Sequence, residues 1–231
     1  MGKLYIVATP IGNLEDITLR ALATLRNVDL VLCEDTRTTG QLLRHFEISK
    51  PLLSLYDQNE LQRLPEIRQM LQEDKNIALV SENGTPLISD PGYKLVRELI
   101  KVGIEVESLP GPSSIISALV VSGMPPDKFF FVGFLPKKES GVSKLLIPIK
   151  ESWKNTPFTV IAFDSPFRVK KSLELIGKHL DNPYVVIERE LTKTYEEIIR
   201  GHAGELKEKL LKRSLKGEIV LLINPKNPFE L

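Results

Sequence analysis

Residues 77–102 read IALVSENGTPLISDPGYKLVRELIKV, and they contain one complete strand, loop and helix. Ile77–Ser81 is a short apolar run of the kind that forms a buried parallel strand, and Tyr93–Val102 has apolar residues at helical spacing. The same alternation recurs through the first half of the chain, which predicts a parallel sheet with helices on both faces. The expected strands there are Lys3–Ala8, Val28–Cys33, Pro51–Ser54, Ile77–Ser81 and Ile104–Leu109, and the expected helices are Asp16–Asn27, Thr36–Phe46, Asn59–Glu73 and Tyr93–Val102.

The ends of the last of these helices carry recognisable signals. Asp90 can cap its start with a side-chain oxygen, and Pro91 suits the first helical position because an N–H there would be unpaired. Gly103 stands where a glycine commonly ends a helix.

The pattern changes near Leu109-Pro110-Gly111-Pro112, so we place a domain boundary there. Residues 1–112 form the first expected α/β domain, and residues 113–231 form the second. The second half combines aromatic and amphipathic strands with helices, which predicts a mixed sheet. Its expected strands are Phe129–Gly133, Phe158–Phe163, Tyr184–Glu188 and Glu218–Ile223, and its expected helices are Ser113–Val121, Ser143–Lys150, Phe167–His179 and Ala203–Leu211.

The composition is that of an ordinary globular protein. Hydrophobic residues make up 42% and charged residues 26% of the chain, and no apolar run approaches the length of a membrane span. Cys33 is the only cysteine, which excludes an internal disulfide. No secretory signal precedes the first expected strand, so we expect a cytoplasmic protein.

Charge is distributed unevenly between the two halves. Residues 1–112 carry 12 Lys and Arg against 16 Asp and Glu, whereas residues 113–231 carry 19 against 14. A basic second half suits a polyanion, although solvated helix faces can produce the same imbalance. The same two alternatives stay open for a group of lysines in that half, Lys137, Lys138, Lys144 and Lys150.

Three loops with glycine and proline follow expected strands, which is where ligands bind in open α/β sheets. They are Ala8–Leu14, Ser81–Tyr93 and Pro110–Ser114. The first can equally be an ordinary turn and the last a domain-boundary turn, whereas the length of the middle loop favours a function. The chain has no GxGxxG fingerprint and no P-loop, which weakens simple dinucleotide and P-loop interpretations.

A fourth segment, Cys33-Glu34-Asp35-Thr36-Arg37, brings two carboxylates and a guanidinium to a strand end. Such a group can move a proton and hold a phosphate. Asp35 or Thr36 can instead cap the helix that follows, and the sequence leaves both interpretations open. The three histidines lack metal-ligand spacing, so we expect no metal site; they are His45, His179 and His202.

Taken in order, eight segments resemble the tetrapyrrole methylase superfamily, and in particular its RNA-directed branch. The resemblance extends from residue 4 to about residue 223. The segments are Thr9-Pro10-Ile11-Gly12-Asn13-Leu14 with Asp16-Ile17-Thr18, Glu34-Asp35-Thr36-Arg37, Gly84-Thr85-Pro86-Leu87-Ile88 with Asp90-Pro91-Gly92-Tyr93, Pro110-Gly111-Pro112-Ser113, Gly133-Phe134-Leu135-Pro136, Ser165 with Arg168, Arg189-Glu190-Leu191-Thr192-Lys193, and Lys216-Gly217-Glu218.

The resemblance implies a two-domain tetrapyrrole-methylase-like fold with S-adenosylmethionine held in a cleft between the domains. It implies 2′-O-methylation of a cytidine ribose in the decoding region of 16S rRNA in the small ribosomal subunit, and a homodimer. The residues that it assigns to the cofactor are Pro10, Gly12, Gly84, Thr85, Pro86, Leu87, Ser113, Ser114, Phe163, Leu191, Lys216, Gly217 and Glu218.

A ribose hydroxyl needs a base to act as a nucleophile, and a positioned base contributes about 10²–10⁴-fold in rate. We expect Asp35 in this role with Glu34 in reserve, and Arg37 and Lys193 to hold phosphates or the 2′-oxygen. The family usually has Asp-Ala where this chain has Glu82-Asn83, and more often Tyr-Glu-Ser at Phe163-Asp164-Ser165. The first departure can weaken or rearrange cofactor binding.

Two other functions stay open at this point. A small-molecule methylase acting on a tetrapyrrole or corrin is one, because fold does not fix substrate. Against it, Glu34–Arg37 and Asp90–Tyr93 look like the RNA-directed branch. A non-catalytic, ribosome-associated nucleotide-binding module is the other, and Glu82 and Asn83 leave room for it.

Overall fold

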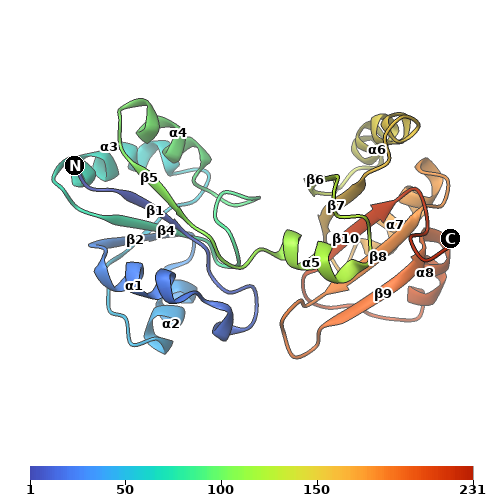
Figure 1. Cartoon of the computed structure of the whole chain (residues 1–231), viewed down its shortest axis with the longest axis horizontal. Helices are drawn as coiled ribbons and strands as arrows, with labels where there is room; N and C mark the ends of the chain where they lie inside the picture. Colours follow the sequence, from blue (N-terminus) through green and yellow to red (C-terminus); the bar gives the residue numbers. More distant parts are fainter. Residues whose placement is uncertain (231) are drawn as a thin grey trace. The chain divides into compact units, whose positions relative to one another are not determined.

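The computed structural model describes residues 1–230 and divides into two compact units (Figure 1). The first unit is Met1–Ser113, and the second begins at Ser114. Each unit contains one five-stranded sheet with helices packed on it. The expected α/β class is confirmed, with a parallel first sheet and a mixed second sheet. No helix within residues 1–230 has both the length and the apolar character of a membrane span.

The first sheet has the order β3-β2-β4-β1-β5, and every neighbouring pair is parallel. Short Val-, Ile- and Leu-rich strands of this kind are typical of sheets that are buried on both faces. The strands are β1 (Leu4–Val7), β2 (Leu30–Cys33), β3 (Leu52–Ser54), β4 (Ile77–Val80) and β5 (Val106–Leu109), and the helices are η1 (Leu14–Asp16), α1 (Leu19–Asn27), α2 (Thr36–His45), α3 (Glu60–Gln72) and α4 (Tyr93–Lys101).

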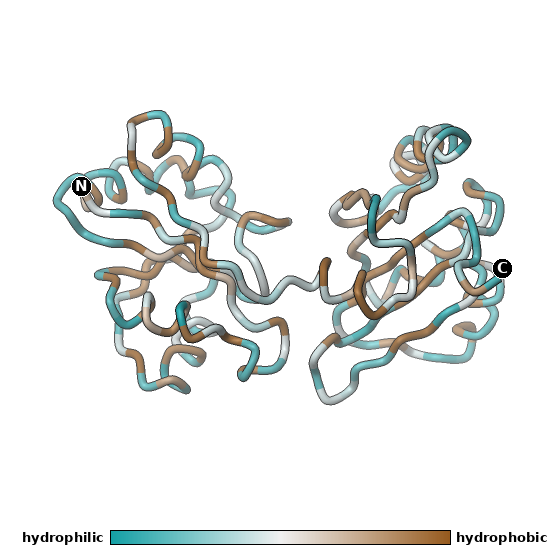
Figure 2. The backbone as a smooth tube through the Cα atoms, in the orientation of Figure 1, coloured by the Kyte–Doolittle hydropathy of each residue, from teal (hydrophilic) through white to brown (hydrophobic). Residues whose placement is uncertain are grey.

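Alternate residues of each strand enter different cores. Leu30 and Leu32 of β2 pack in a cluster with side chains of α3 and α4. Val31 and Cys33 of the same strand pack with side chains of α1 and α2 on the opposite face. Figure 2 shows the hydrophobic residues concentrated along these central strands. Helices therefore cover both faces, and only the strand ends are open to a ligand.

The second sheet has the order β6-β7-β10-β8-β9, in which only β6 and β7 are parallel. Helices α6, α7 and α8 contribute to the core on one face, and α5 contacts β10 and β8. The strands are β6 (Phe129–Phe134), β7 (Thr159–Asp164), β8 (Tyr184–Arg189), β9 (Glu197–His202) and β10 (Ile219–Asn224), and the helices are α5 (Ser114–Ser122), α6 (Glu139–Trp153), α7 (Val169–His179) and α8 (Ala203–Leu210).

Strand β9 is absent from the sequence prediction. It is an edge strand that pairs only with β8, and its residues EIIRGH alternate poorly between apolar and polar. Edge strands make few apolar contacts, so their sequences carry little periodic signal.

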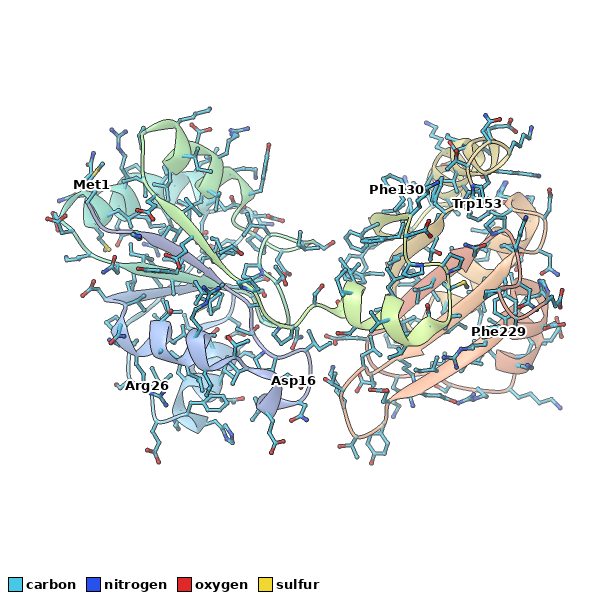
Figure 3. The ribbon with its side chains drawn as sticks, in the orientation of Figure 1. Met1, Asp16, Arg26, Phe130, Trp153 and Phe229 are labelled. Carbon is cyan, nitrogen blue, oxygen red and sulfur yellow. The ribbon has the colours of Figure 1, made fainter. Side chains whose placement is uncertain are left out.

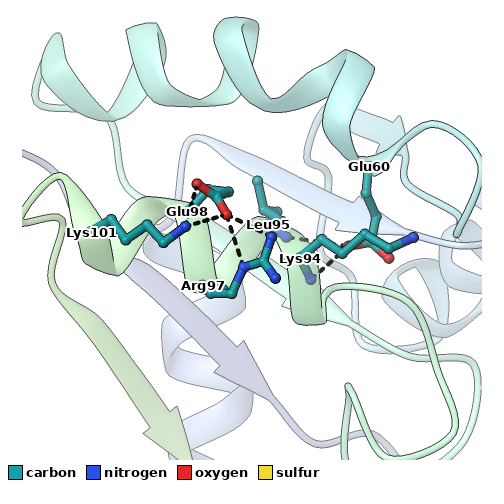
Figure 4. A network of polar contacts seen from close by, with 6 residues as sticks. All are labelled: Glu60, Lys94, Leu95, Arg97, Glu98 and Lys101. Carbon is teal, nitrogen blue, oxygen red and sulfur yellow. Dashed lines mark hydrogen bonds and ion pairs between the residues drawn. The ribbon is translucent and has the colours of Figure 1, made fainter.

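The start of α4 differs from the expectation (Figure 4). Asp90 does not cap this helix and Pro91 is not its first residue, because the chain passes through Gly92 at φ 120° and the helix begins at Tyr93. The buried Glu60 carboxylate, from the start of α3, accepts hydrogen bonds from the Lys94 and Leu95 amides at 2.9 and 3.2 Å. A carboxylate from another helix thus satisfies the amides that a local cap would have served.

The other end of α4 follows the prediction. Gly103 has φ 78° directly after the helix, and its N–H donates to the Ile100 carbonyl at 3.0 Å. The Ile104 amide donates to the Leu99 carbonyl at 3.1 Å, which completes a glycine-dependent helix end.

Candidate active site

The loops that follow β1 and β4 leave the centre of the first sheet in opposite directions. These two strands are neighbours, but α1 packs on one face and α4 on the other. Such a point, where the following helices diverge, opens a crevice at the carboxyl ends of the strands. The loops after β2 and β5 lie at the same edge, because all five strands are parallel.

Backbone hydrogen bonds join the first and third predicted loops. The Thr9 amide donates to the Gly84 carbonyl at 2.9 Å, and the Gly84 amide donates to the Thr9 carbonyl at 3.1 Å. The fully buried Thr9 hydroxyl donates to the Ser81 carbonyl at 3.1 Å, and the Ser81 hydroxyl donates to the Gly84 carbonyl at 2.9 Å. Neither hydroxyl was predicted to act in this way; the signal in the sequence is a small polar residue directly after an apolar strand.

Gly84 lies where a side chain would be obstructed. Its φ is 85°, and an added Cβ would come within 3.1 Å of the Ile11 side chain and 3.6 Å of the Pro112 carbonyl. The Thr85 hydroxyl donates to the same Pro112 carbonyl at 3.1 Å. Three of the predicted loops therefore meet at Gly84, where backbone can approach a ligand closely.

Two residues of the long loop after β4 have unusual backbone conformations. Leu87 and Ser89 have φ values of 71° and 66°, a region that side chains other than glycine seldom occupy. Such strain costs on the order of 1–3 kcal/mol for each residue and concentrates at functional sites. The backbone conformation of this loop is thus maintained by contacts with the rest of the unit rather than by the intrinsic φ preferences of its residues.

Carboxylates gather along the same edge of the sheet. Burial, together with the charges of Glu34, Glu82 and Asp57, raises the pKa of Asp90 to about 6. Burial and the neighbouring carboxylates also raise the pKa of Glu34. The resulting negative potential favours a cationic ligand group and disfavours a phosphate at this point. Asp57 was not predicted, because no spacing rule connects it with the loop after β4.

Asp35 serves as the N-cap of α2. Its carboxylate accepts from the Arg37 amide at 2.7 Å and pairs with the Arg37 guanidinium at 2.7 Å. These hydrogen bonds lower the pKa of Asp35 to about 2, which makes it a weak base. The capping interpretation that the sequence left open is therefore correct for Asp35, and Arg37 is held by an ion pair rather than directed at a free anion.

Predicted site residues of the second unit gather at one end of its sheet. Lys193 donates to Glu218 at 2.8 Å and to Glu190 at 3.2 Å, and the Glu218 amide donates to Glu190 at 2.9 Å. Gly217 has φ 88°, and a side chain there would collide with the Glu190 carboxyl. Glu190 thus ties two predicted segments together, with Lys193 as its counter-ion.

We divide the predicted site residues into two groups according to the unit in which they lie. Phe163, in the second, is partly buried and packs against Phe131 and Phe134 at ring-centre distances of 4.9 and 5.3 Å. The first group holds Pro10, Gly12, Glu34, Asp35, Arg37, Gly84, Thr85, Pro86, Leu87 and Ser113, and the second holds Ser114, Phe163, Leu191, Lys193, Lys216, Gly217 and Glu218. No set of three or more His, Cys, Asp or Glu side chains in residues 1–230 is arranged to hold a metal ion.

A family model for Tetrapyrrole (Corrin/Porphyrin) Methylases matches residues 3–207. The chain belongs to the tetrapyrrole methylase family. A relative from Thermotoga maritima, named ribosomal RNA small subunit methyltransferase I, is 46% identical over 98% of this chain and 100% of its own length. The protein of that name from Escherichia coli O157:H7 is 50% identical over 96% of this chain and 77% of its own length.

Solved structures support the fold of this tetrapyrrole methylase family member. Uroporphyrin-III-C-methyltransferase from Thermus thermophilus aligns with a TM-score of 0.66 at 18% identity, covering 96% of this chain and 94% of that one. Diphthine synthase aligns with a TM-score of 0.74 at 12% identity, covering 96% and 90%. At these identities the likeness concerns the fold alone.

Proposed function

We propose that this chain is an S-adenosylmethionine-dependent methyltransferase that acts on the RNA of the small ribosomal subunit. The observation that carries the proposal is identity of 46 to 50% to methyltransferases of that name along nearly the whole chain. The proposed product is a 2′-O-methylated cytidine in the decoding region of 16S rRNA, which would make the protein cytoplasmic. A homodimer is part of the same proposal.

The residues of the first group suit the amino acid and ribose of the cofactor. Gly84 leaves room for close backbone approach, and the Thr9–Gly84 hydrogen bonds fix the loop that would make the contact. The carboxylates around Asp90 favour the positive charges of the cofactor. S-adenosylmethionine supplies an electrophilic methyl group when bound. We propose that Phe163, Leu191 and Lys216–Glu218 contact the same cofactor molecule.

The chain must also take a proton from the ribose hydroxyl. We propose a carboxylate of the Glu34-Asp35 pair as the base, and the raised pKa of Glu34 supports Glu34 over Asp35. A base with a higher pKa accepts a proton more readily, and Asp35 is already occupied by Arg37. Lys193 would hold a phosphate or the 2′-oxygen after exchanging one of its carboxylate partners.

The deciding experiment is to map ribose methylation on small-subunit RNA after incubation with the protein and labelled cofactor. One 2′-O-methylated cytidine in the decoding region is the expected result. A matched incubation with a tetrapyrrole precursor tests the alternative that the family description raises. Methyl transfer to the tetrapyrrole and none to RNA would overturn the proposal.

A further inference from the structure

Two loops of the second unit lie side by side at the carboxyl ends of β6 and β7. These strands are parallel neighbours with Phe134 opposite Phe163. The Leu135 amide donates to the Phe163 carbonyl at 2.9 Å, and the Arg168 guanidinium donates to the Leu135 carbonyl at 3.0 Å. Residues 135–138 and 165–168 are therefore fixed against each other.

Phe167 projects from the second of these loops and is 93% exposed, the highest value among the large hydrophobic side chains that are exposed in residues 1–230. Its backbone is nevertheless held by hydrogen bonds. The Phe167 amide donates to the Ser165 hydroxyl at 3.3 Å, and the Val169 amide donates to the Ser165 carbonyl at 3.0 Å. A hydrogen-bonded turn thus presents an aromatic ring to solvent, where the ring can stack on a planar group.

Lys137 and Lys138 project from the first loop. Both are exposed, and neither side-chain ammonium group has a hydrogen-bond or ion-pair partner within the described part of the chain. An added Cβ at Gly141 would lie 2.8 Å from Pro136, so the turn that carries the lysines packs closely on α6. Two unpaired cations are thus held beside the loop that carries Phe167.

The nearby carboxylates are already neutralised. Asp164 is buried and pairs with Arg168 at 3.1 Å, and Glu139 pairs with Lys178 at 3.1 Å. An approaching polyanion therefore meets the two free lysines without opposing charge from these two groups.

We propose that Lys137, Lys138 and Phe167 form a surface that binds single-stranded RNA, with the lysines on phosphates and a base stacked on Phe167. This inference rests on the proposed function and names a part of the chain that holds the RNA. A single strand with unstacked bases suits the surface, because an aromatic side chain can stack on a base only when that base is not stacked between its neighbours in the strand.

The test uses the full chain and a fluorescein-labelled single-stranded RNA, with its duplex as comparison. Phe167→Ala is expected to weaken single-strand binding by about five- to 150-fold, and Phe167→Trp is expected to restore it. Lys137→Ala with Lys138→Ala is expected to reduce the slope of log affinity against log salt by about 1.4, at about 0.7 for each phosphate contact.

The matched controls are Phe129→Ala and Lys128→Ala, which remove an exposed aromatic ring and an exposed lysine at the opposite end of β6. Phe130, labelled in Figure 3, lies near that end of the strand. The controls are expected to bind RNA as the wild type does, and every variant is expected to bind S-adenosylmethionine normally.

Unchanged single-strand affinity in Phe167→Ala would overturn the inference, and so would equal binding of duplex and single strand by the wild type. Methylation mapping with the same wild-type preparation tests the proposed function independently of RNA binding by this surface. A wild type that methylates small-subunit RNA while the Phe167 and lysine variants bind normally would refute this surface alone. Loss of RNA binding in those variants supports the surface whatever substrate the mapping identifies.

Discussion

The Glu188 side chain carries an ionisable carboxyl group in a fully buried position. It lies on β8 between β10 and β9, and neither of its carboxylate oxygens has a hydrogen-bond partner within residues 1–230. Burial raises its pKa from 4.5 to about 8, with the Arg200 charge opposing this effect. The carboxyl group is therefore mostly neutral at neutral pH, because ionisation without a partner is costly.

This pKa has a definite consequence for stability. The folded protein keeps the Glu188 proton up to about pH 8, whereas the unfolded chain releases it near pH 4.5, so the free energy of unfolding falls as pH rises between these values. Glu188→Gln is expected to remove this loss and to stabilise the protein by at least about 1 kcal/mol at pH 8. Urea unfolding at pH 5 and pH 8 measures the effect. The exposed Glu208→Gln is the control, and an equal gain at both pH values would contradict the prediction.

Gly84 is the residue on which the cofactor loop depends. Gly84→Val would strain a backbone at φ 85° and crowd Ile11, so we expect S-adenosylmethionine affinity to fall by more than tenfold. Calorimetry measures the affinity. Gly103→Val is a matched control, because Gly103 has φ 78° but no atom within 4 Å of its added Cβ. That control should lose stability and keep its affinity; equal affinities in both variants would remove Gly84 from the site.

The two candidate bases can be separated by their variants. Glu34→Gln is expected to lower kcat by about 10²-fold or more with unchanged cofactor affinity, because the amide cannot accept the proton. Asp35→Asn keeps an oxygen for the α2 cap and should reduce kcat less, since the pKa of Asp35 of about 2 makes it a poor base. Single-turnover rates on folded protein compare them. Near-normal turnover in Glu34→Gln with a large loss in Asp35→Asn would reverse the assignment.

At the scale of elements, helix α4 depends on a partner from α3. The Glu60 carboxylate accepts from two amides at its start, whereas Glu98 within the helix makes exposed ion pairs with Arg97 and Lys101 (Figure 4). Both carboxylates thus interact with residues of α4, but the Glu60 side chain is buried whereas the ion pairs of Glu98 are exposed.

Removal of the two carboxylates should have unequal costs. Glu60→Ala is expected to reduce the free energy of unfolding by about 2–3 kcal/mol, because hydrogen bonds to a buried charged group are lost. Glu98→Ala is expected to cost less than about 1 kcal/mol, as exposed ion pairs do. Urea unfolding compares the variants with the wild type. Equal costs would show that α4 does not rely on Glu60.

At the scale of the whole molecule, charge is divided between the halves of the chain. The first half carries an excess of acidic residues and places carboxylates at the edge of its sheet, and the second carries an excess of Lys and Arg. The net charge of +1 is therefore the sum of an acidic first half and a basic second half. An acidic half suits a cationic cofactor, and a basic half suits an anionic substrate.

This separation predicts that substrate and cofactor respond differently to salt. RNA binding by the full chain should weaken between about 50 and 200 mM salt, because phosphate contacts release counterions. S-adenosylmethionine affinity should change little, since its contacts are short and local. Fluorescence and calorimetric titrations over this range measure both. Salt-independent RNA binding would argue for a small neutral substrate instead.

The sequence by itself determined the alternation of strands and helices, the parallel first sheet and the glycine that ends α4. These follow from contacts between residues near in the chain and from the burial of alternate side chains. The edge strand β9 lacked that signal, because few apolar contacts fix it.

Only the tertiary structure decided the chemistry of individual carboxylates. Glu60 caps a helix more than thirty residues away, Asp35 is held by Arg37, and Asp90 has its pKa raised by burial and by the charge of Glu34 from another strand end. Asp35 and Thr36 looked equally able to cap α2 until the contacts were known. The physical reason is that pKa values and hydrogen-bond partners depend on distances through space, which spacing along the chain does not specify.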